Sequence, residues 1–539
     1  MTNTNLRVAV IVDSNKIPNW THQLIKSVIE APFTTLVAVF ILTPRKPPRT
    51  GLGGFIKQKW DRYDGRKLRP KAAALKRLDT LDHAAEISQV SIDLNNDCFH
   101  FEAEDLNKTE TYQLDVVLNL NQWWPKGDLL ALPRNGVWHF FFGDYQKRRH
   151  SMPYASHEFL TRQGYMGTCL LKLSKKSLDH QVLFKSFSHV DQTSLNRTLQ
   201  FSQWKCISFA MRKLKQLSQL GSAIFEERTI QDNSLIFGDL PPVTNGTLGL
   251  TLTQLKRTLH KKLRAKFITE DWILLFSQAP EPTTDFSKYR KIIPPKDRFW
   301  ADPFLLFRNG KHYVFLEEVI KKKRKGHISV LEIDDKGNYS QPVKILSKPY
   351  HLSYPYLIEW EDELYMIPES SGNKTIDVYK CVEFPHRWEF HKTIMEGVEA
   401  VDATLFYYDT KWWLFANIKE RPGYPNWDEL FLFYSDEPFS TSWVSHPANP
   451  IISDVRSARP AGKIFRWGQK IYRPSQNCAH RYGYGMKFNQ IVTLTETSYR
   501  EIEVSSVDPL WEPQIKAIHT FNFEAGLSII DAKLERFKF

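Results

Sequence analysis

Continuous apolar runs alternate with an amphipathic run over the first 190 residues. LRVAVIVDS, TTLVAVFIL, LDVVLNLN and GVWHFFFGD are the apolar runs, at 6–14, 34–42, 114–121 and 136–144. Between the first two, NWTHQLIKSVIEAP has apolar positions every three or four residues, as a helix does. Unbroken apolar strands are typical of a sheet covered on both faces, and strand–helix–strand predicts a βαβ unit. We therefore predict an α/β domain over residues 1–190.

Residues 191–270 have the pattern of connecting helices. Within them LKRTLHKKLRAKF, at 255–267, is both basic and amphipathic. Such a helix can lie on a membrane surface or cover the edge of a domain, and we favour the second interpretation. Peripheral membrane contact is the alternative.

The pattern changes after residue 270 to short strands and tight turns that repeat. Four segments each combine an apolar strand, a turn and an aromatic-rich strand, and a weaker fifth copy follows. Their first polar positions, the strand heads, are Asp302, Tyr354, Asp402, Arg459 and His519, and the first four are spaced by 52, 48 and 57 residues. A period near 50 with paired strands is typical of a β-propeller. We predict a five-bladed all-β propeller over 271–539, with WILLF at 272–276 closing the ring against the last blade.

The repeat predicts where polar side chains meet. In an antiparallel hairpin, the head of the first strand and the end of the second lie at one edge. The matching strand ends are Glu317, Glu369, Asn417 and Gln476. In a propeller the innermost strands surround the central channel, so we expect these heads and ends to ring one mouth of it.

A ring of this composition suggests carbohydrate chemistry. Two carboxylates can act on a glycosidic bond as general acid and general base. Asp302 would be the base or nucleophile, Glu369 or Glu317 the acid, and Asp402 would tune the acid or hold a hydroxyl. The alternative is that strand-head acids only cap loops.

The other polar positions are candidates for substrate contacts. They are Glu317, Tyr354, Asn417, Arg459, Arg473, Gln476 and His519. Arg459 and Arg473 could hold a carboxylate, sulfate or phosphate in bidentate fashion. Two further segments, SDVRSARPAG at 453–462 and CAHRYGYGMKFNQ at 478–490, are either ligand loops or packing elements between blades, and both interpretations stay open.

Composition narrows the class of protein. The net charge of +13 favours acidic partners, but much of it lies in residues 256–266 and 321–325, and no nucleic-acid motif accompanies it. The five cysteines are scattered without a CxxC pair, which indicates neither disulfides nor a metal site and favours a reducing cytoplasm. Aromatic residues reach 13%, as expected of a protein that stacks on sugars or of any large β domain. The start has no signal-peptide pattern, so we expect a cytoplasmic protein, peripheral to the inner membrane if it contacts one.

Several motifs of the second half carry a family resemblance. FWADPFLLF, SYPYLIEW, VDATLF, SARPAGKIF and RPSQNC resemble the β-propeller domain of the glucosamine inositolphosphorylceramide transferase family, over about residues 270–535. In plants that domain precedes a separate glycosyltransferase domain, and bacterial proteins carry it without one. It is similar in turn to the propellers of arabinanases, levansucrases and invertases. This likeness implies that Asp302 and Asp402 match two catalytic acids, with Glu369 the candidate third.

The first half resembles a formyltransferase domain. DVVLNLN, GVWHFFFGD, GYMGTCLLKL and SLDHQVL follow that family's order, and Asp179 matches its catalytic Asp. His139 lies two residues before the position of the catalytic His. The resemblance implies formyl-tetrahydrofolate as a cofactor, or else a degenerate domain that binds a substrate or partner.

We therefore expect a carbohydrate-active protein that transfers or processes glycosyl groups in bacterial surface polysaccharide or glycolipid synthesis. Its substrate would be a sugar, nucleotide sugar or glycolipid, and its partners would be polysaccharide-assembly enzymes. The alternatives are a non-catalytic protein that binds a glycan or headgroup, and an amino-sugar formyltransferase. Whether it is an enzyme, and which donor and acceptor it uses, are left open at this point.

Overall fold

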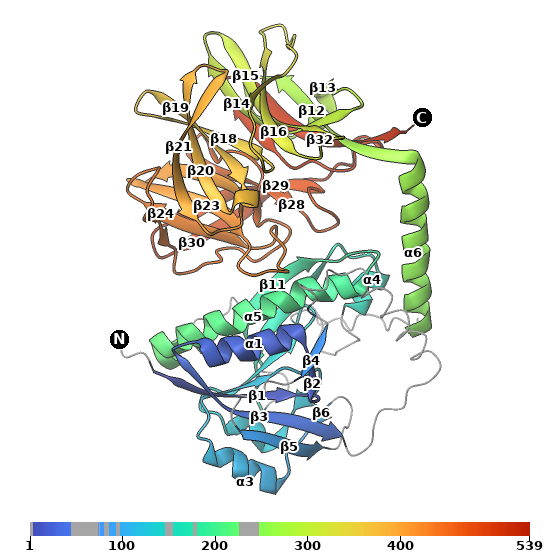
Figure 1. The fold of residues 1–539 in the computed structure, drawn as a ribbon, viewed down its shortest axis with the longest axis vertical. Helices are drawn as coiled ribbons and strands as arrows, with labels where there is room; N and C mark the ends of the chain where they lie inside the picture. The colour runs from blue at the N-terminus through green and yellow to red at the C-terminus, as the bar shows by residue number, and fades with distance from the viewer. Residues whose placement is uncertain are drawn as a thin grey trace. The chain divides into compact units, whose positions relative to one another are not determined.

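The computed structural model describes residues 4–44, 74, 76–79, 86–92, 98–145, 155–175, 180–225 and 247–538. Its contacts divide the chain into two compact units, Met1–Thr258 and Leu259–Phe539 (Figure 1).

A seven-stranded sheet forms the centre of the first unit. Its strands, in spatial order, are β11 (Gln181–His189), β10 (Tyr165–Lys172), β9 (Val137–Phe141), β7 (Val116–Asn119), β1 (Leu6–Val12), β3 (Thr34–Pro44) and β5 (Glu86–Ile92). The five strands from β9 to β5 are parallel, while β10 runs antiparallel to both β9 and β11. Val8, Val10 and Ile11 are fully buried, which explains the unbroken apolar run.

Helices and short elements complete the first unit. The helices are α1 (Asn19–Glu30), α3 (Ala103–Thr111), α4 (Ser156–Leu160), α5 (Leu195–Leu220) and α6 (Thr247–Phe267), with 3-10 turns η2 (Gly127–Ala131) and η3 (Gly221–Phe225). Two strand pairs are small: β2 (Lys16–Pro18) with β4 (Arg77–Asp79), and β6 (Cys98–Phe99) with β8 (Trp124–Pro125). The α/β layering is as predicted, and the formyltransferase-like character stays a prediction.

The expected connector at 191–270 is divided between the two units. α5 packs on α1, β10 and β11 of the first unit, where the rings of Phe184 and Phe209 lie 4.5 Å apart. The reason is that α5 buries its own apolar side chains on more than one side, with Ile207, Phe209 and Leu214 fully buried. Only α6 continues from the first unit into the second.

Five sheets of four or five strands make up the second unit, as predicted for a five-bladed propeller. The first blade is β14 (Arg298–Arg308), β15 (Lys311–Ile320), β16 (Gly326–Ile333) and β17 (Val343–Leu346). The second is β18 (Ser353–Trp360), β19 (Glu363–Ser370), β20 (Thr375–Glu383) and β21 (Arg387–Glu396). The third is β22 (Ala400–Tyr408), β23 (Lys411–Ile418), β24 (Leu430–Ser435) and β25 (Val444–Ser445).

The last two blades depart from this regular pattern. The fourth is β26 (Arg459–Pro460), β27 (Phe465–Trp467), β28 (Lys470–Asn477), β29 (Gly485–Leu494) and β30 (Tyr499–Val507), so its first strand is broken in two. The closing blade is β13 (Arg290–Ile292), β12 (Ile268–Gln278), β32 (Leu527–Phe537) and β31 (Phe521–Glu524), with turns η4 (Phe286–Lys288) and η5 (Ser371–Asn373) elsewhere in the unit. β12 pairs with β32 along its whole length, which confirms the predicted closure of the ring.

The hairpins share two backbone features. At their tips, pairs of residues such as Asn309–Gly310, Glu361–Asp362 and Asp409–Thr410 have positive φ, as in the turns that match strand twist. At their heads, the first three blades each have a bulge. The residues that begin these bulges, Asp302, Tyr354 and Asp402, have φ of +49°, +45° and +53°. Thus the same strained position recurs in three blades, where L-residues are uncommon.

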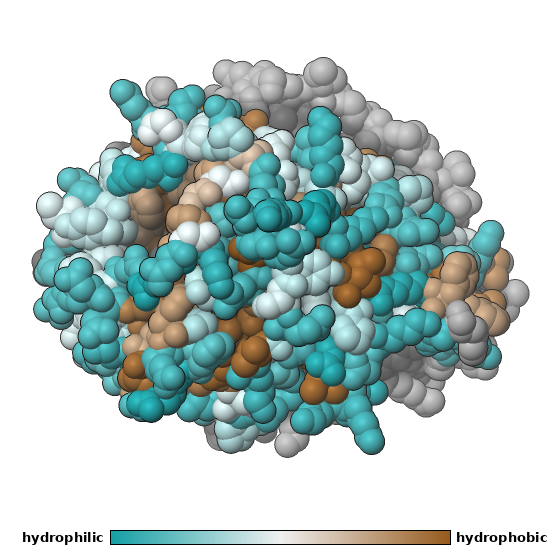
Figure 2. Space-filling model, turned by 90° about the horizontal axis from the view of Figure 1, so that it is seen from above, coloured by the Kyte–Doolittle hydropathy of each residue, from teal (hydrophilic) through white to brown (hydrophobic). Residues whose placement is uncertain are grey.

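The molecule's surface is mostly polar on the face drawn in Figure 2. There, hydrophilic residues cover most of the area, and hydrophobic residues gather only in small separate groups. The apolar side chains of the blades are instead buried between neighbouring sheets, as where the Phe304 and Tyr354 rings meet at 4.7 Å.

Candidate functional site

Strand register brings the predicted heads and ends together at one edge of each blade. The pairs across the hairpins are Ala301–Glu317, Ser353–Glu369, Val401–Asn417 and Arg459–Gln476. In the first three blades each end residue therefore faces the position just before the head. We call the following group the mouth cluster: Asp302, Glu317, Glu369, Asp402, Arg459, Gln476, His519 and Asp531.

Asp302 is a buried carboxylate of the first blade that is hydrogen-bonded to the second blade and to the closing blade. Its Oδ1 accepts a hydrogen bond from the Thr520 hydroxyl at 2.8 Å, and its Oδ2 accepts one from the Tyr354 backbone N–H at 3.2 Å. Its own N–H donates to Asp531 at 2.9 Å. Burial, together with the nearby carboxylates of Glu317, Asp531 and Asp402, raises the pKa of Asp302 to about 7, although His519 opposes the shift. This acid therefore keeps its proton to a higher pH than an exposed aspartate does.

His519 connects Asp302 to a second buried acid. Its Nδ1 lies 2.5 Å from Asp531, and its Nε2 lies 3.7 Å from Asp302. The other Asp531 oxygen accepts the backbone N–H groups of His519 and Thr520, each at 3.0 Å. Burial by itself lowers the pKa of His519, but Asp531 and Asp302 raise it above its ordinary value. The ring also stacks on Trp272 at 4.0 Å, so its orientation is fixed.

The ligand atoms of Asp302, His519 and Asp531 lie within 4.8 Å of one another, close enough to surround a metal ion. In this arrangement, however, His519 and two backbone N–H groups already satisfy Asp531. The geometry thus serves as a hydrogen-bonded chain without an ion, and the expectation of no metal stays a prediction.

Asp402 and Arg459 form the other half of the mouth cluster. The Arg459 guanidinium donates to both Asp402 oxygens, at 2.5 and 3.2 Å, and Gln476 donates to one of them at 3.3 Å. Burial raises the pKa of Asp402 to about 7 and Glu369 adds to the shift, while Arg459 opposes it. Arg459 also lies 3.7 Å from Glu369, so it connects two of the three predicted catalytic acids.

The outer part of the mouth cluster is more accessible. The Glu317 carboxylate lies 2.9 Å from His351, whose side chain is 46% exposed. Glu369 accepts a hydrogen bond from Ser371 at 2.7 Å. The ring of Tyr482, from the segment at 478–490, lies under the Arg459 guanidinium at 4.9 Å and stacks on Trp427 at 5.9 Å. Aromatic faces beside carboxylates are a usual setting for a sugar ring, although sequence reasoning did not single out Trp427 or His351.

Three of the residues predicted to contact the substrate lie outside the mouth cluster. Tyr354 is fully buried, and its hydroxyl bonds Thr404 at 2.8 Å and the Gly462 carbonyl at 3.1 Å. Arg473 makes a bidentate ion pair with Glu501, with both N–O distances at 2.7–2.8 Å. The geometry thus favours structural roles for both.

Asn417 is the third, and it differs from the other two. Its Nδ2 donates to the Glu429 carbonyl at 2.7 Å, while its buried Oδ1 has no hydrogen-bond partner. It therefore keeps an acceptor for a ligand or a water.

Asp531 and Thr520 are site residues that the sequence reasoning missed. The same rule that gave Glu317 and Glu369 would have pointed to Asp531, because it lies on the second strand of the fifth copy. That copy has a shorter hairpin, with 12 residues from His519 to Asp531 against 15 from Asp302 to Glu317. The head-to-end spacing of the earlier copies therefore does not lead to Asp531. The sequence signal for Asp531 is an acid inside the apolar run SIIDAKL.

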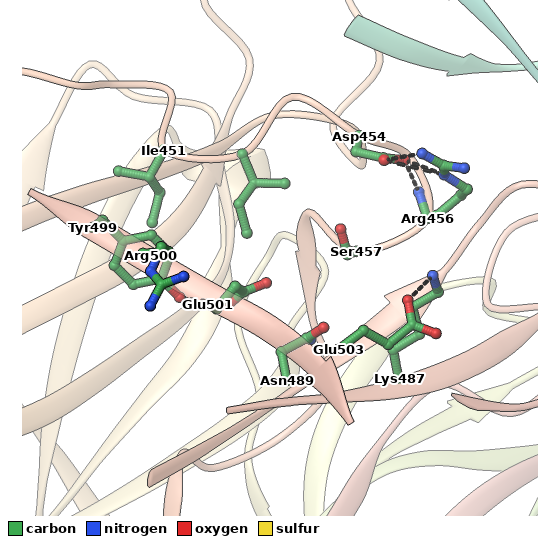
Figure 3. A pocket seen from close by; sticks show the side chains of 11 residues that line it. Ile451, Asp454, Arg456, Ser457, Lys487, Asn489, Tyr499, Arg500, Glu501 and Glu503 are labelled. Atoms are coloured by element: carbon green, nitrogen blue, oxygen red, sulfur yellow. Dashed lines mark hydrogen bonds and ion pairs between the residues drawn. The ribbon is translucent and has the colours of Figure 1, made fainter. Parts of the chain in front are cut away.

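A separate pocket of about 440 Å³ lies beside the fourth blade (Figure 3). It is lined by Ile451, Ile452, Asp454, Arg456, Ser457, Lys487, Asn489, Tyr499, Arg500, Glu501 and Glu503. Asp454 and Arg456 pair with each other at 2.6 Å, and so do Lys487 and Glu503. The segment at 453–462 thus lines a pocket whose charges largely neutralise one another.

A smaller polar group lies in the first unit, around the predicted residue His139. Asn119 donates to His139 Nδ1 at 2.8 Å, and Asn121 donates to Asn119 at 2.6 Å. Asn119 is the last residue of β7, and His139 lies opposite it in the middle of the parallel strand β9. The carboxyl end of a parallel strand is where α/β proteins bind ligands. Burial lowers the pKa of His139 to about 3, so the ring is neutral, and Trp124 covers it at 4.4 Å. Asp179 lies outside the described residues.

The second unit is similar in sequence to known proteins. Residues 289–522 match the family model described as glucosamine inositolphosphorylceramide transferase 1, N-terminal. Curated relatives of that name include a rice protein (Oryza sativa subsp. japonica), 34% identical over 210 residues, and an Arabidopsis thaliana protein, 33% identical over 209 residues. The match covers 38% of this chain in both cases, and 28% and 27% of the relatives, so the chain spans about a quarter of their length.

Two of the solved structures that match this chain are glycoside hydrolases. A family 117 enzyme from Zobellia galactanivorans is 10% identical with a TM-score of 0.32, and covers 49% of this chain and 90% of its own. A GH62 α-L-arabinofuranosidase from Coprinopsis cinerea is 10% identical with a TM-score of 0.33, and covers 49% and 97%. The five blades are defined by the strand order of the sheets. Over residues 289–522, then, this chain is similar to the N-terminal part of glucosamine inositolphosphorylceramide transferase 1.

Proposed function

We propose that the propeller binds a sugar-bearing substrate and transfers or processes its glycosyl group at the mouth cluster. The observation that supports this is the meeting of Asp302, Glu369 and Asp402 at one edge of three blades, inside the segment that resembles a transferase. The name of the relatives points to a glycolipid acceptor of the inositolphosphorylceramide class and an amino-sugar donor. For this chain we propose the broader class, a nucleotide sugar with a lipid-linked acceptor.

The three acids differ in what they can do. Asp302, with its pKa raised to about 7 by burial, suits a proton donor better than the base or nucleophile role expected from sequence. Glu369 has the most exposed side chain of the three, 12% against 8% for Asp302 and 2% for Asp402, so a substrate reaches it first. Asp402 accepts hydrogen bonds from Arg459 and would hold the Arg459 guanidinium in position beside Glu369.

The test is turnover by acid variants of the full-length protein. Nucleotide sugars and lipid acceptors would be incubated with wild type, Asp302→Asn and Glu369→Gln, and products followed by mass spectrometry. We expect product from wild type and at least a hundredfold less from either variant, the range that general acid–base groups supply, roughly 10²–10⁴. Glu359→Gln is the matched control, because Glu359 lies on the same blade with a 57% exposed side chain, near the hairpin tip. Full turnover by both acid variants would remove the propeller acids from the chemistry.

A non-catalytic protein that binds a glycan or headgroup is the second candidate. The observation that favours it is that the most buried acids are already paired within the protein. Asp402 pairs with Arg459, and Asp531 pairs with His519. Binding on a glycan array, without product by mass spectrometry, would select this function over catalysis.

An amino-sugar formyltransferase is the third candidate, and the Asn119–His139 pair is the observation that favours it. Calorimetry with a formyl-folate analogue tests it, and the absence of binding heat would reject it. The bacterial polysaccharide setting, the assembly-enzyme partners and the cytoplasmic location stay predictions, and the curated relatives named above are plant proteins.

A further inference from the structure

Helix α6 carries a stripe of exposed apolar side chains. Its members are Leu252, Leu255, Leu259, Leu263 and Phe267, spaced by three or four residues and 38–58% exposed. That spacing places them on one face of the helix. The first two belong to the first unit and the others to the second, and each is exposed where it stands.

Packing of α6 uses a different face. Leu250, Thr251 and Gln254 are buried, and the Arg257 guanidinium donates to the Phe159 carbonyl at 2.7 Å and lies over the Phe159 ring at 4.7 Å. These contacts hold the start of the helix on its own unit. The apolar stripe is therefore additional to the packing face and is not needed for it.

The charge on α6 is entirely of one sign. From Thr247 to Phe267 the helix has no Asp or Glu, and its basic residues are Lys256, Arg257, Lys261, Lys262, Arg264 and Lys266, with His260. Arg264 is engaged by Glu270 and Glu535 of the second unit. Lys256, Lys261, Lys262 and Lys266 are exposed. At about 100° per residue, Lys256 and Lys266 lie within the arc of the stripe, Lys262 lies at its edge, and Lys261 lies on the opposite side of the helix. Long lysine side chains can extend from such positions towards lipid phosphates while the leucines enter the acyl region.

We propose that α6 binds the surface of an anionic lipid bilayer, with the leucine stripe inserted and the lysines on the headgroups. Among the described residues, no helix is long and apolar enough to cross a membrane. A second copy of this chain is a poorer occupant of the stripe, because two such helices side by side would bring like charges together. This inference does not depend on catalysis.

Co-sedimentation of the full-length chain with vesicles tests the proposal. Wild type should sediment with phosphatidylcholine vesicles that contain about one third phosphatidylserine, and not with pure phosphatidylcholine, because surface charge attracts basic segments. Sedimentation should fall as salt is raised. Failure to sediment with the anionic vesicles would overturn the proposal.

Two pairs of variants separate the stripe from general charge. The double variant Leu259→Gln with Leu263→Gln should bind at least tenfold more weakly, while Lys262→Gln with Lys266→Gln, which removes two exposed charges at the stripe, should bind more weakly mainly at low salt. The matched control is Lys322→Gln with Lys323→Gln, which removes two exposed charges from the β15–β16 turn of the propeller and should bind like wild type. Equal binding by the leucine variant, or an equal loss in the control, would overturn the assignment to α6. A wild-type dimer in light scattering that the leucine variant loses, without vesicle binding, would assign the stripe to self-association.

Discussion

Arg459 and Asp402 form an ion pair with almost no exposure, 7% and 2% for the two side chains. Replacing Arg459 with Met would leave Asp402 beside Glu369 without its cation. Breaking a buried pair in this way costs about 3–5 kcal/mol. We expect Arg459→Met to lower the free energy of unfolding by that amount in urea denaturation.

The control for that prediction is the exposed pair Arg387–Glu389, with side chains 64% and 61% exposed. Arg387→Met should change the free energy of unfolding by less than about 1 kcal/mol, because water screens such pairs. Similar losses in the two variants would show that burial does not strengthen the mouth pair.

Asp302 gives a prediction for the pH dependence of stability. Its ordinary pKa of 3.8 is raised to about 7 in the folded protein, so between these values the unfolded chain releases a proton that the folded protein keeps. Stability from this group therefore falls as pH rises from about 4 to about 7 and is constant above that. Asp302→Asn removes the titration and tolerates the positive φ, because Asn is favoured there.

Chemical denaturation of wild type and Asp302→Asn between pH 5 and pH 8 measures this. The Asn variant should gain stability relative to wild type as pH rises towards about 7. Parallel profiles for the two proteins would mean that Asp302 keeps an ordinary pKa in the folded state.

At the scale of the element, the break in the first strand of the fourth blade has a visible cause. Gly462 has φ of +120°, and a Cβ placed there would lie 2.0 Å from the Phe521 carbonyl oxygen. The Ala461 carbonyl accepts the Phe521 N–H at 2.8 Å, so the strand leaves its own sheet to contact the closing blade. Only a residue without a side chain allows this approach.

Gly462→Ala should therefore destabilise the propeller by several times the cost of a positive φ alone. Gly468→Ala is the control, because Gly468 has φ of +59° but a Cβ there meets no atom within 4 Å. We expect about 1–2 kcal/mol for the control, the cost of the left-handed conformation. Thermal unfolding of both variants measures the difference, and equal midpoints would show that the strand can move away from Phe521.

How far the sequence predicts the elements depends on which signal each one leaves. Apolar runs and turn pairs placed the hairpins correctly, because register follows from side-chain alternation and turn length. Alternation could also have separated Arg473 from Gln476, since residues three apart on a strand point to opposite faces. The sequence did not show which side chain pairs with Arg473, because its partner Glu501 lies on a different strand. The bulges at the heads of the first three blades left no signal beyond the repeated polar position.

At the scale of the whole molecule, ring closure is what makes the second unit one body. β12 comes before the first repeat and β32 after the last, yet they share a sheet over eleven residue pairs. Asp531 on β32 receives the N–H of Asp302, so closure also positions the mouth cluster. The sequence predicted this closure from WILLF, but not that an acid on the closing strand completes the cluster.

Removing the closing strands should therefore affect stability and the site together. A chain that ends at Ile518 lacks β31 and β32, which leaves one edge of β12 unpaired and exposes the apolar faces against which Ile529 and Ile530 were buried. We expect it to lose cooperative unfolding of the propeller and near-ultraviolet circular dichroism from its packed aromatics. A chain that ends at Phe537 keeps both strands and should unfold like wild type. If the shorter chain unfolded at the wild-type midpoint, the propeller would be stable with an open ring, and the fixed geometry of Asp302 would need another source than the closing blade.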